Sequence, residues 1–184
     1  MIVLGITGPI GAGKDEVSNY LEKKYGFKTF SCGDIIREIA KDEGAEPNRE
    51  NLQKIGKRYR KKEGKGFLGR KAVEMIEKSK DERIAINGIR NPEEVEVLRE
   101  NLGRSFKLIL VQAENQIRFE RLSNRKRTGD PERIEEFKKQ DRDEKEKFNM
   151  EKTFSMSNKR LDNNGSFEEL HKNIDKILKD LTNE

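Results

Sequence analysis

The stretch GPIGAGKDEVS at residues 8–18 is built almost like a phosphate-binding loop. The pattern G-x-x-x-x-G-K-[ST] requires two glycines and a lysine at fixed spacing, and Gly8, Gly13 and Lys14 supply them. Glycines let backbone N–H groups turn inward around a phosphate, and the lysine adds a mobile positive charge. The next residue, Asp15, departs from the pattern, which has a serine or threonine hydroxyl there as a magnesium ligand.

Asp15 has two interpretations that the sequence alone leaves open. A carboxylate is an oxygen donor, so it could hold Mg²⁺ directly or through water. It could instead serve only as an acid in the first turn of a helix, where it complements the positive end of the helix dipole. An ordinary strand-to-helix turn is the alternative for the loop as a whole, but the spacing, the lysine and the position between strand and helix favour a phosphate site.

Polar side chains also follow the other candidate strands. In open α/β sheets, ligands bind beyond the carboxyl ends of the strands. The residues found there are Ser31, Asp34 and Arg37 after one strand, Asn87 and Arg90 after the next, and Arg118, Arg121, Arg125 and Arg127 after a third. Arginine forks match phosphate oxygens, so this set could move a phosphoryl group by positioning and electrostatic stabilisation.

Each of these residues also has a structural interpretation. Asp34 could cap a helix that begins near Ile35. Arg37 could be a surface residue, and Arg90 could pair with Glu94. The placement of the polar residues at successive strand ends favours the functional interpretation.

The elements that must position these residues alternate along the chain. Short apolar blocks predict strands at 2–7, 27–32, 83–89 and 106–113, with a fifth near 157–162. Helical spacing occupies 15–25, 66–80 and 92–101, and a capping box formed by Ser166 and Glu169 opens the last helix. This alternation predicts an α/β fold with a five-stranded parallel sheet flanked by helices.

Two segments do not fit the alternation. Residues 45–71 hold extra helices between the second and third strands, and residues 126–150 are almost wholly polar. A helix as polar as the second segment is expected to extend over solvent rather than into a core. Both segments are interpreted as inserts in a single domain spanning 1–184.

Composition narrows the class of protein. The chain has 184 residues, 41% of them charged and 32% hydrophobic, with a formal net charge of +5. The charges nearly balance and the apolar residues are concentrated in blocks, so we expect a folded protein rather than a disordered one. No apolar run is long enough to cross a membrane and no basic segment precedes the first one, which favours a cytoplasmic protein. One cysteine and one histidine exclude a His/Cys zinc site within the chain and favour an oxygen-bound metal.

The motifs GITGPIGAGK, CGDIIRE, NGIRNPEE and RFERLSNR, followed by the polar segment, resemble the nucleoside monophosphate kinase superfamily. That group includes adenylate kinases and dephospho-CoA kinases, and the likeness is greatest to small archaeal-type relatives of these enzymes. It covers nearly the whole chain. The resemblance implies a P-loop NTPase fold, ATP as phosphoryl donor and Mg²⁺ as cofactor. It also implies that 45–71 holds the acceptor-binding helices and that 126–150 is a lid that closes on substrate.

On the ATP side, the resemblance assigns the phosphates to the loop. The loop residues concerned are Gly8, Gly11, Ala12, Gly13, Lys14 and Asp15. Asn163, in LDNNGSFEEL, would lie near adenine. Arg121 and Arg125 would contact the ATP phosphates and the transferring group, with Arg142 as the nearest candidate for a further lid arginine.

On the acceptor side, the resemblance assigns a phosphate grip to Arg37 and Arg90, and Arg60 joins them through its YRKKEG motif. Asp34 would lie near Mg²⁺, as in adenylate kinases, or act as a base on an acceptor hydroxyl, as in dephospho-CoA kinases. Lys14, Asp34, Arg121 and Arg125 are therefore the candidate catalytic residues, and Asp15 and Asp34 the candidate metal ligands.

Two departures from the family pattern lie close to the expected metal. Asp15 replaces the hydroxyl, and Asn87 stands where many relatives carry an acid. One carboxylate has appeared where another is missing. We therefore hypothesise that Asp15 takes over part of the metal-holding task.

Three functions are compatible with the sequence. The first is transfer of the ATP γ-phosphate to a nucleoside monophosphate or deoxynucleotide. The second is dephospho-CoA-kinase-like phosphorylation of a sugar hydroxyl. The third is an NTP-dependent RNA-binding factor, because residues 54–71 hold nine basic residues against one acid. Only Tyr59 and Phe67 could stack on bases there, which makes nucleic acid the less favoured partner. The sequence leaves the oligomeric state open.

Overall fold

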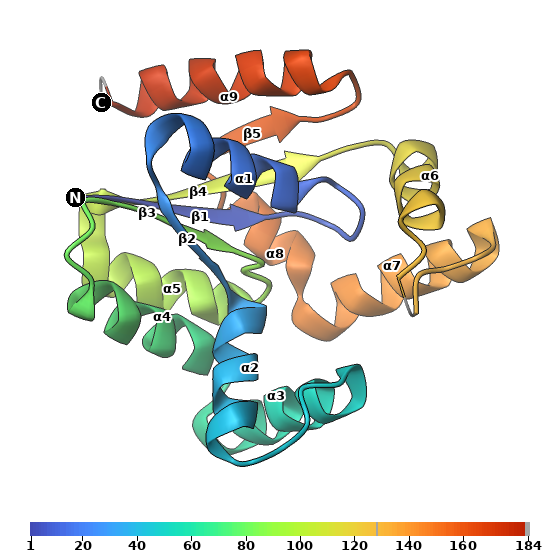
Figure 1. Ribbon diagram of the computed structural model, residues 1–184, viewed down its shortest axis with the longest axis horizontal. Coiled ribbons are helices and arrows are strands. Elements are labelled where there is room, and N and C mark those ends of the chain that lie inside the picture. The colour runs from blue at the N-terminus through green and yellow to red at the C-terminus, as the bar shows by residue number, and fades with distance from the viewer. Residues whose placement is uncertain (128, 183–184) are drawn as a thin grey trace.

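The computed structural model describes residues 1–127 and 129–182 (Figure 1). Residue 128, within the expected lid segment 126–150, and residues 183–184, at the end of the expected domain, lie outside the described residues. Over the described ranges, a five-stranded parallel sheet has the strand order β2-β3-β1-β4-β5. The predicted α/β fold with a five-stranded parallel sheet flanked by helices is confirmed.

The strands are close to their predicted ranges. They are β1 (Ile2–Thr7), β2 (Lys28–Ser31), β3 (Arg83–Asn87), β4 (Phe106–Gln112) and β5 (Lys159–Asp162). β3 ends two residues before the predicted boundary at 89, because Gly88 has φ +82° and turns the chain out of the sheet. The backbone N–H groups of Gly88 and Ile89 both donate to the carbonyl of Ile6, which fixes this turn against β1.

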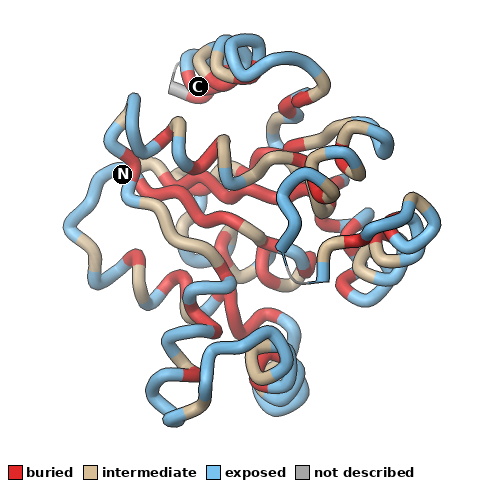
Figure 2. Tube along the Cα trace, turned by 45° about the vertical axis from the view of Figure 1, so that its right-hand side comes forward, coloured by how far each residue is buried: buried red, intermediate tan, exposed pale blue. Residues whose placement is uncertain are grey.

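Helices cover both faces of the sheet (Figure 1). α1 (Lys14–Tyr25) and α9 (Phe167–Thr182) pack on the face that carries Leu4 and Ile6. α2 (Cys32–Asp42), α4 (Phe67–Lys78) and α5 (Pro92–Leu102) pack on the other face, against Val3 and its neighbours. Because successive strand side chains point to opposite faces, a buried parallel strand supplies both cores. Figure 2 shows the resulting buried strands at the centre of the molecule.

Two predicted helix starts are confirmed by their capping contacts. Asn91 and Glu94 form a capping box at α5, with Pro92 at its first position. At the last helix, the backbone N–H of Ser166 donates to Glu169 at 2.9 Å, and the backbone N–H of Glu169 donates to the Ser166 hydroxyl at 3.2 Å. These boxes satisfy N–H groups that have no partner within the helix.

The two segments expected to be inserts, 45–71 and 126–150, both contain helices. The first holds α3 (Arg49–Glu63) and the start of α4, and a short 3₁₀ turn, η1 (Gly103–Ser105), precedes β4. After α6 (Asn115–Arg125), the second insert holds α7 (Ile134–Phe148), which is followed by α8 (Met150–Ser155). The expectation that the polar segment extends over solvent is wrong for one face of α7, because Phe137, Asp141 and Phe148 on that face are buried.

Candidate functional site

The loop between β1 and α1 has the backbone that a phosphate cradle needs. Gly8 has φ +148° and Gly13 has φ +93°, a range that side chains with a Cβ rarely adopt. A Cβ at Gly8 would overlap the carbonyl oxygen of Val111, and one at Gly13 would overlap the side-chain amide of Asn163. Gly13 caps α1, and over the described residues no side chain makes a capping hydrogen bond at this positive end of the helix, which leaves its N–H groups for an anion.

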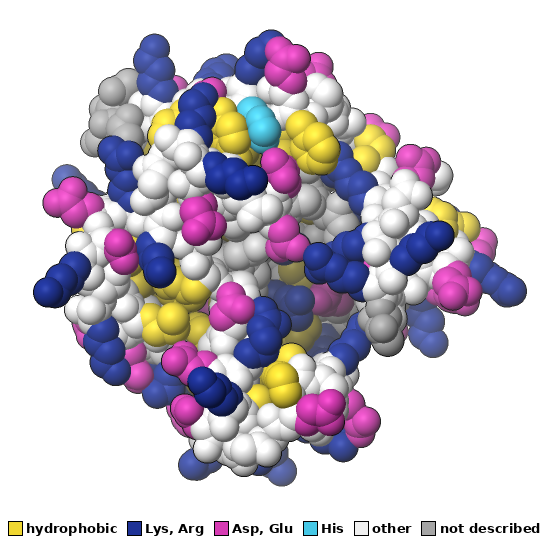
Figure 3. All heavy atoms as spheres, viewed as in Figure 1, with side chains coloured by type: hydrophobic (Ala, Val, Ile, Leu, Met, Phe, Trp, Pro, Cys, Tyr) yellow, Lys and Arg dark blue, Asp and Glu magenta, His cyan; other side chains and the backbone are white. Residues whose placement is uncertain are grey.

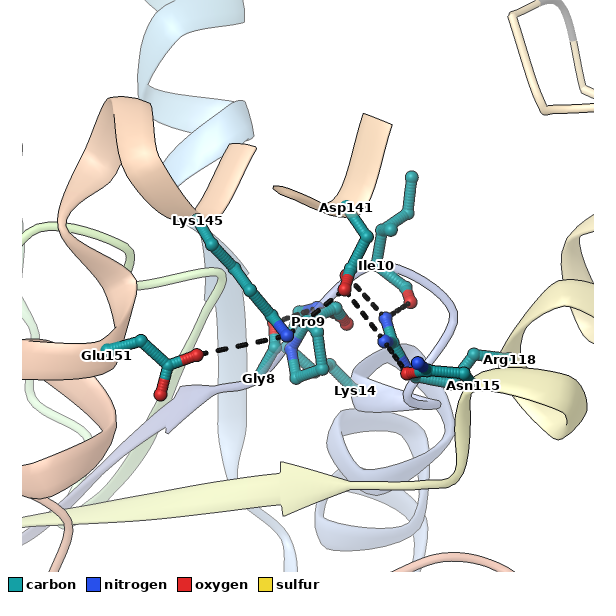
Figure 4. Close-up of polar contacts among 9 residues, drawn as sticks. All are labelled: Gly8, Pro9, Ile10, Lys14, Asn115, Arg118, Asp141, Lys145 and Glu151. Atoms are coloured by element: carbon teal, nitrogen blue, oxygen red, sulfur yellow. Dashed lines mark hydrogen bonds and ion pairs between the residues drawn. The ribbon is translucent and has the colours of Figure 1, made fainter. Parts of the chain in front are cut away.

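Lys14 lies folded onto this loop. Its Nζ donates to the backbone carbonyls of Gly8 at 2.8 Å and Pro9 at 3.0 Å (Figure 4). Burial, reinforced by the nearby positive charge of Arg90, lowers the pKa of the Lys14 amine to about 8. A poorly solvated ammonium whose hydrogen bonds go to neutral carbonyls gains a stronger partner when a phosphate enters the loop.

The lowered pKa predicts a pH dependence of nucleotide binding. Below pH 8 the Lys14 amine carries its proton and attracts phosphate. As the pH rises through about 8, the free protein loses this charge. Above that pH, Lys14 must take up a proton when the nucleotide binds, which lowers the affinity. We expect ADP affinity to fall by about tenfold between roughly pH 7 and pH 9, where the phosphates are already ionised. Titration calorimetry across this range measures it. Lys14→Arg, whose guanidinium stays charged, should give a flat profile; a flat profile for the unaltered protein would contradict the prediction.

Asn163 and Arg121 lie against the same loop. The Asn163 side-chain amide is buried and donates to the carbonyl of Ala12 at 2.8 Å, so its amide group supports the loop. Arg121 Nη2 donates to the Asn163 backbone carbonyl at 2.9 Å. Arg121 Nη1 is buried and has no hydrogen-bond partner among the described residues. A phosphate oxygen would satisfy this N–H group, so the loop and its surroundings fit ATP.

Arg118 makes the most extensive polar contacts around the loop. Its guanidinium donates to both carboxylate oxygens of Asp141 at 2.6 and 2.9 Å, to the carbonyl of Ile10 at 2.9 Å and to Asn115 at 2.7 Å (Figure 4). Burial alone would raise the pKa of the Asp141 carboxyl, but the bonds from Arg118 outweigh it and hold that pKa below its ordinary value. Arg118 therefore ties α7 to the phosphate loop. The sequence pointed to this arginine but not to Asp141.

The other arginines expected to act from the lid side, Arg125, Arg127 and Arg142, have different surroundings. Arg125 makes a two-pronged contact with Asp130, through Nε at 2.9 Å and Nη2 at 2.5 Å. Arg127 Nη1 lies 3.9 Å from Asp15 Oδ2. Arg142 lies on the exposed side of α7. A catalytic role for Arg125 stays a prediction, and it requires exchange of Asp130 for a ligand phosphate.

The two residues that depart from the family pattern, Asp15 and Asn87, contact each other in the structure. Asn87 Nδ2 donates to Asp15 Oδ1 at 2.9 Å. Ser31, at the end of β2, is the register partner of Asn87, so the strand end near Asp34 is adjacent. The described residues contain no cluster of three or more His, Cys, Asp or Glu side chains that could hold a metal. Mg²⁺ bound through one or two carboxylates, substrate phosphates and water does not need such a cluster, so the oxygen donors here fit it.

Asp34 is part of a capping box. Ser31 is the N-cap of α2, and Asp34 Oδ2 accepts hydrogen bonds from the backbone N–H and the hydroxyl of Ser31, each at 2.7 Å. Arg37 donates to Asp34 Oδ1 at 2.6 Å. Burial would raise the pKa of the Asp34 carboxyl, but these bonds outweigh it and lower that pKa. Because α2 begins at Cys32 and the Asp34 carboxylate completes its capping box, helix capping is enough to explain the contacts that Asp34 makes.

Arg60 and Arg90 converge on an aromatic ring that the sequence did not connect with them. Their guanidinium carbons lie 5.0 and 5.3 Å from the ring centroid of Phe148, at the end of α7. Arg60 Nε is buried without a hydrogen-bond partner in the described part of the chain. Arg90 pairs with Glu144 at 3.2 Å, whereas only its backbone N–H contacts Glu94. Figure 3 shows a hollow on one face of the molecule, with Lys and Arg side chains around it.

The basic stretch 54–71 does not present aromatic platforms for bases. Tyr59 and Phe67 stack on each other with ring centroids 5.5 Å apart, and Phe67 is fully buried. Single-stranded RNA recognition relies on exposed stacking surfaces, so this geometry disfavours it. Separately, none of the helices over the described ranges has the length and apolarity needed to cross a membrane.

The sheet order, the glycine loop and the helical inserts define a small P-loop protein of the kinase-like class. The chain belongs to the AAA domain family AAA_17, which matches residues 7–138. A UPF0200 protein from Methanothermobacter thermautotrophicus is 36% identical over 182 residues, covering 98% of this chain and 91% of that relative.

Two solved structures share the fold. TT1252 from Thermus thermophilus has a TM-score of 0.63 at 21% identity, covering 98% of this chain and 97% of its own. Shikimate kinase from Acinetobacter baumannii, solved with shikimate, has a TM-score of 0.62 at 16% identity, covering 100% of this chain and 94% of its own. At these identities the likeness establishes the fold, and together with the AAA_17 match it confirms the P-loop kinase-like resemblance.

Proposed function

We propose that the protein is an ATP-dependent kinase that transfers the γ-phosphate to the phosphate of a nucleoside monophosphate or deoxynucleotide. The observation that carries this proposal is the convergence of Arg60 and Arg90 on Phe148, close enough to Lys14 for Arg90 to affect its pKa. An anionic acceptor held there lies beside the donor phosphates. Bringing two anions together requires cations, which these residues provide.

Each group has a defined task in this proposal. Lys14 and the loop N–H groups hold the donor phosphates, and the unpaired Nη1 of Arg121 donates to one of their oxygens. Arg60 and Arg90 hold the acceptor phosphate. Mg²⁺, when bound, neutralises phosphate charge. The acceptor oxygen is already ionised, so no general base is needed, and the low pKa of the Asp34 carboxyl agrees with this.

A hydroxyl acceptor is the second candidate, favoured by the likeness to a shikimate kinase, whose named ligand is not a nucleotide. In that case a base must accept the hydroxyl proton, and Asp34 in the first turn of α2 would be that base. The substitution Asp34→Asn separates the two candidates, because it abolishes a base but leaves a phosphate grip intact.

One experiment tests the proposal. The protein is incubated with Mg-ATP and a panel of nucleoside monophosphates, deoxynucleoside monophosphates, dephospho-CoA and shikimate, and ADP release is followed. We expect a nucleoside monophosphate to accelerate ADP release. Acceleration by dephospho-CoA or shikimate alone would establish the second candidate, and ADP release that no compound accelerates would overturn both.

Asp15 is expected to act on the metal. Asp15→Asn should weaken Mn²⁺ binding to the protein–ADP complex by about tenfold, the lower range for loss of a group that supports a metal site. Electron paramagnetic resonance of free Mn²⁺ measures this without turnover. Glu16→Gln, an acid one residue along that contacts His171, is the matched control and should have no effect.

Restoring an acid at position 87 should compensate for the loss of the Asp15 carboxylate. Asn87→Asp places a carboxylate at the strand end that contacts Asp15, so the double variant Asp15→Asn/Asn87→Asp should recover Mn²⁺ affinity. Unchanged Mn²⁺ affinity in Asp15→Asn would show that Asp15 serves only the helix dipole.

A further inference from the structure

One face of α7 contacts the candidate site through four residues. Phe137, Asp141, Glu144 and Phe148 follow helical spacing, so they lie on one side of the helix. The two aromatic side chains are buried at the ends of this row, and the two carboxylates lie between them.

The four residues form two similar contacts with arginines. Arg118 pairs with Asp141, and its guanidinium carbon lies 4.9 Å from the ring centroid of Phe137. Arg90 pairs with Glu144 and lies over the ring of Phe148. Each arginine is thus held by one carboxylate and one aromatic face from the same helix.

The two contacts differ in how readily they can be exchanged. The side chains of Arg118 and Asp141 are only 1% and 10% exposed, and Arg118 is bound by three groups. The side chains of Arg90 and Glu144 are 45% and 19% exposed, and a single ion pair at 3.2 Å joins them. Water and other anions can therefore reach Arg90 far more readily than Arg118, so the contact of Arg90 with Glu144 is the one that an incoming anion can replace.

We propose that Glu144 is an internal stand-in for the anionic group of the acceptor: its carboxylate occupies Arg90 until the acceptor displaces it. This inference rests on the proposed function, in which Arg90 grips the acceptor phosphate. Because Glu144 belongs to α7, displacement by an acceptor also releases one of the two carboxylate–arginine pairs that this helix makes with Arg90 and Arg118. The contact of Arg118 with Asp141 keeps the helix attached meanwhile.

The test uses inorganic phosphate as the probe, with ADP saturating the phosphate loop, and measures phosphate affinity by titration calorimetry. If Glu144 occupies Arg90 in most molecules, Glu144→Gln should tighten phosphate binding by about tenfold. Glu144→Asp, which keeps the charge but shortens its reach, should tighten it to a smaller extent. Glu146→Gln removes the same charge from an exposed position on the same helix and should have no effect.

A further pair of variants locates the effect. Arg90→Gln should abolish this phosphate binding, and Glu144→Gln should then have no effect in the Arg90→Gln background. If Arg90→Gln abolishes binding but Glu144→Gln leaves affinity unchanged, the stand-in proposal is overturned while the phosphate grip stands. If Arg90→Gln does not weaken phosphate binding, Arg90 is not the grip and both proposals fail. Equal tightening by Glu146→Gln would also overturn the specific role of Glu144.

Discussion

Replacing Lys14 with methionine is expected to lower the rate of phosphoryl transfer by on the order of a thousandfold. The Lys14 ammonium is the positive side-chain charge that the glycine loop itself contributes, and it donates hydrogen bonds to the loop carbonyls. In the transition state it stabilises charge on the transferring group, whereas backbone N–H groups can still bind ground-state phosphates. Turnover should therefore fall much further than ADP affinity.

The measurement is acceptor-dependent ADP release under saturating Mg-ATP, with ADP affinity determined in parallel by calorimetry. Lys23→Met removes the same charge from an exposed position of α1 and should leave both quantities unchanged. Equal losses of affinity and turnover in Lys14→Met would mean that Lys14 stabilises the bound ground state and the transition state to the same extent. Turnover within threefold of the unaltered protein would contradict its proposed role.

The elements that follow from local pattern were predictable. β1 and β4 are buried on both faces and are nearly continuous apolar runs, and the glycine loop lies between a strand and a helix as its spacing requires. The capping residues Asn91 and Ser166 lie beside the groups they cap. Neighbouring residues determine these features, so the sequence contains the whole signal.

The partners of the charged side chains were not predictable in the same way. The sequence gathers Arg118, Arg121 and Arg125 on one helix, but their environments differ because each meets a distant group: Asp141, the Asn163 carbonyl and Asp130. Asn163 likewise supports Ala12 with its side-chain amide, a contact between residues at opposite ends of the chain. In a chain with 41% charged residues, many pairings are compatible with composition, and only packing selects among them.

The same reason explains why the role of α7 was missed. Its polar sequence is typical of a solvated helix, since charged residues flank Phe137 on both sides and precede Phe148. Asp141 and Glu144 nevertheless lie on the inner face, where arginines from α6 and from the segment that follows β3 pair with them. An interpretation based on helical periodicity assigns each carboxylate to the exposed face of a helix. It therefore cannot identify a carboxylate that is buried because it pairs with an arginine.

The largest effect on stability is expected from breaking the buried ion pair between Arg118 and Asp141. Asp141→Ala should lower the free energy of unfolding by about 3–5 kcal/mol, because it leaves Arg118 charged and buried without its carboxylate. The loss is expected to be large since Arg118 is almost wholly inaccessible and cannot turn to water. Asp143→Ala removes an acid from an exposed position on the same helix, and should change the free energy by less than about 0.5 kcal/mol. Urea titration measures both, with an unchanged slope confirming that the unfolding transition remains comparable.

A double substitution distinguishes the charge from the packing. Arg118→Met/Asp141→Leu removes both charges while keeping apolar volume, so it should recover much of the stability lost in Asp141→Ala. It also removes the bond from Arg118 to the Ile10 carbonyl, so the loop loses its connection to α7 even where stability returns. We therefore expect the double variant to remain folded yet bind ADP more weakly than the unaltered protein. Recovery of both stability and ADP affinity would show that the pair serves stability alone and does not position the phosphate loop.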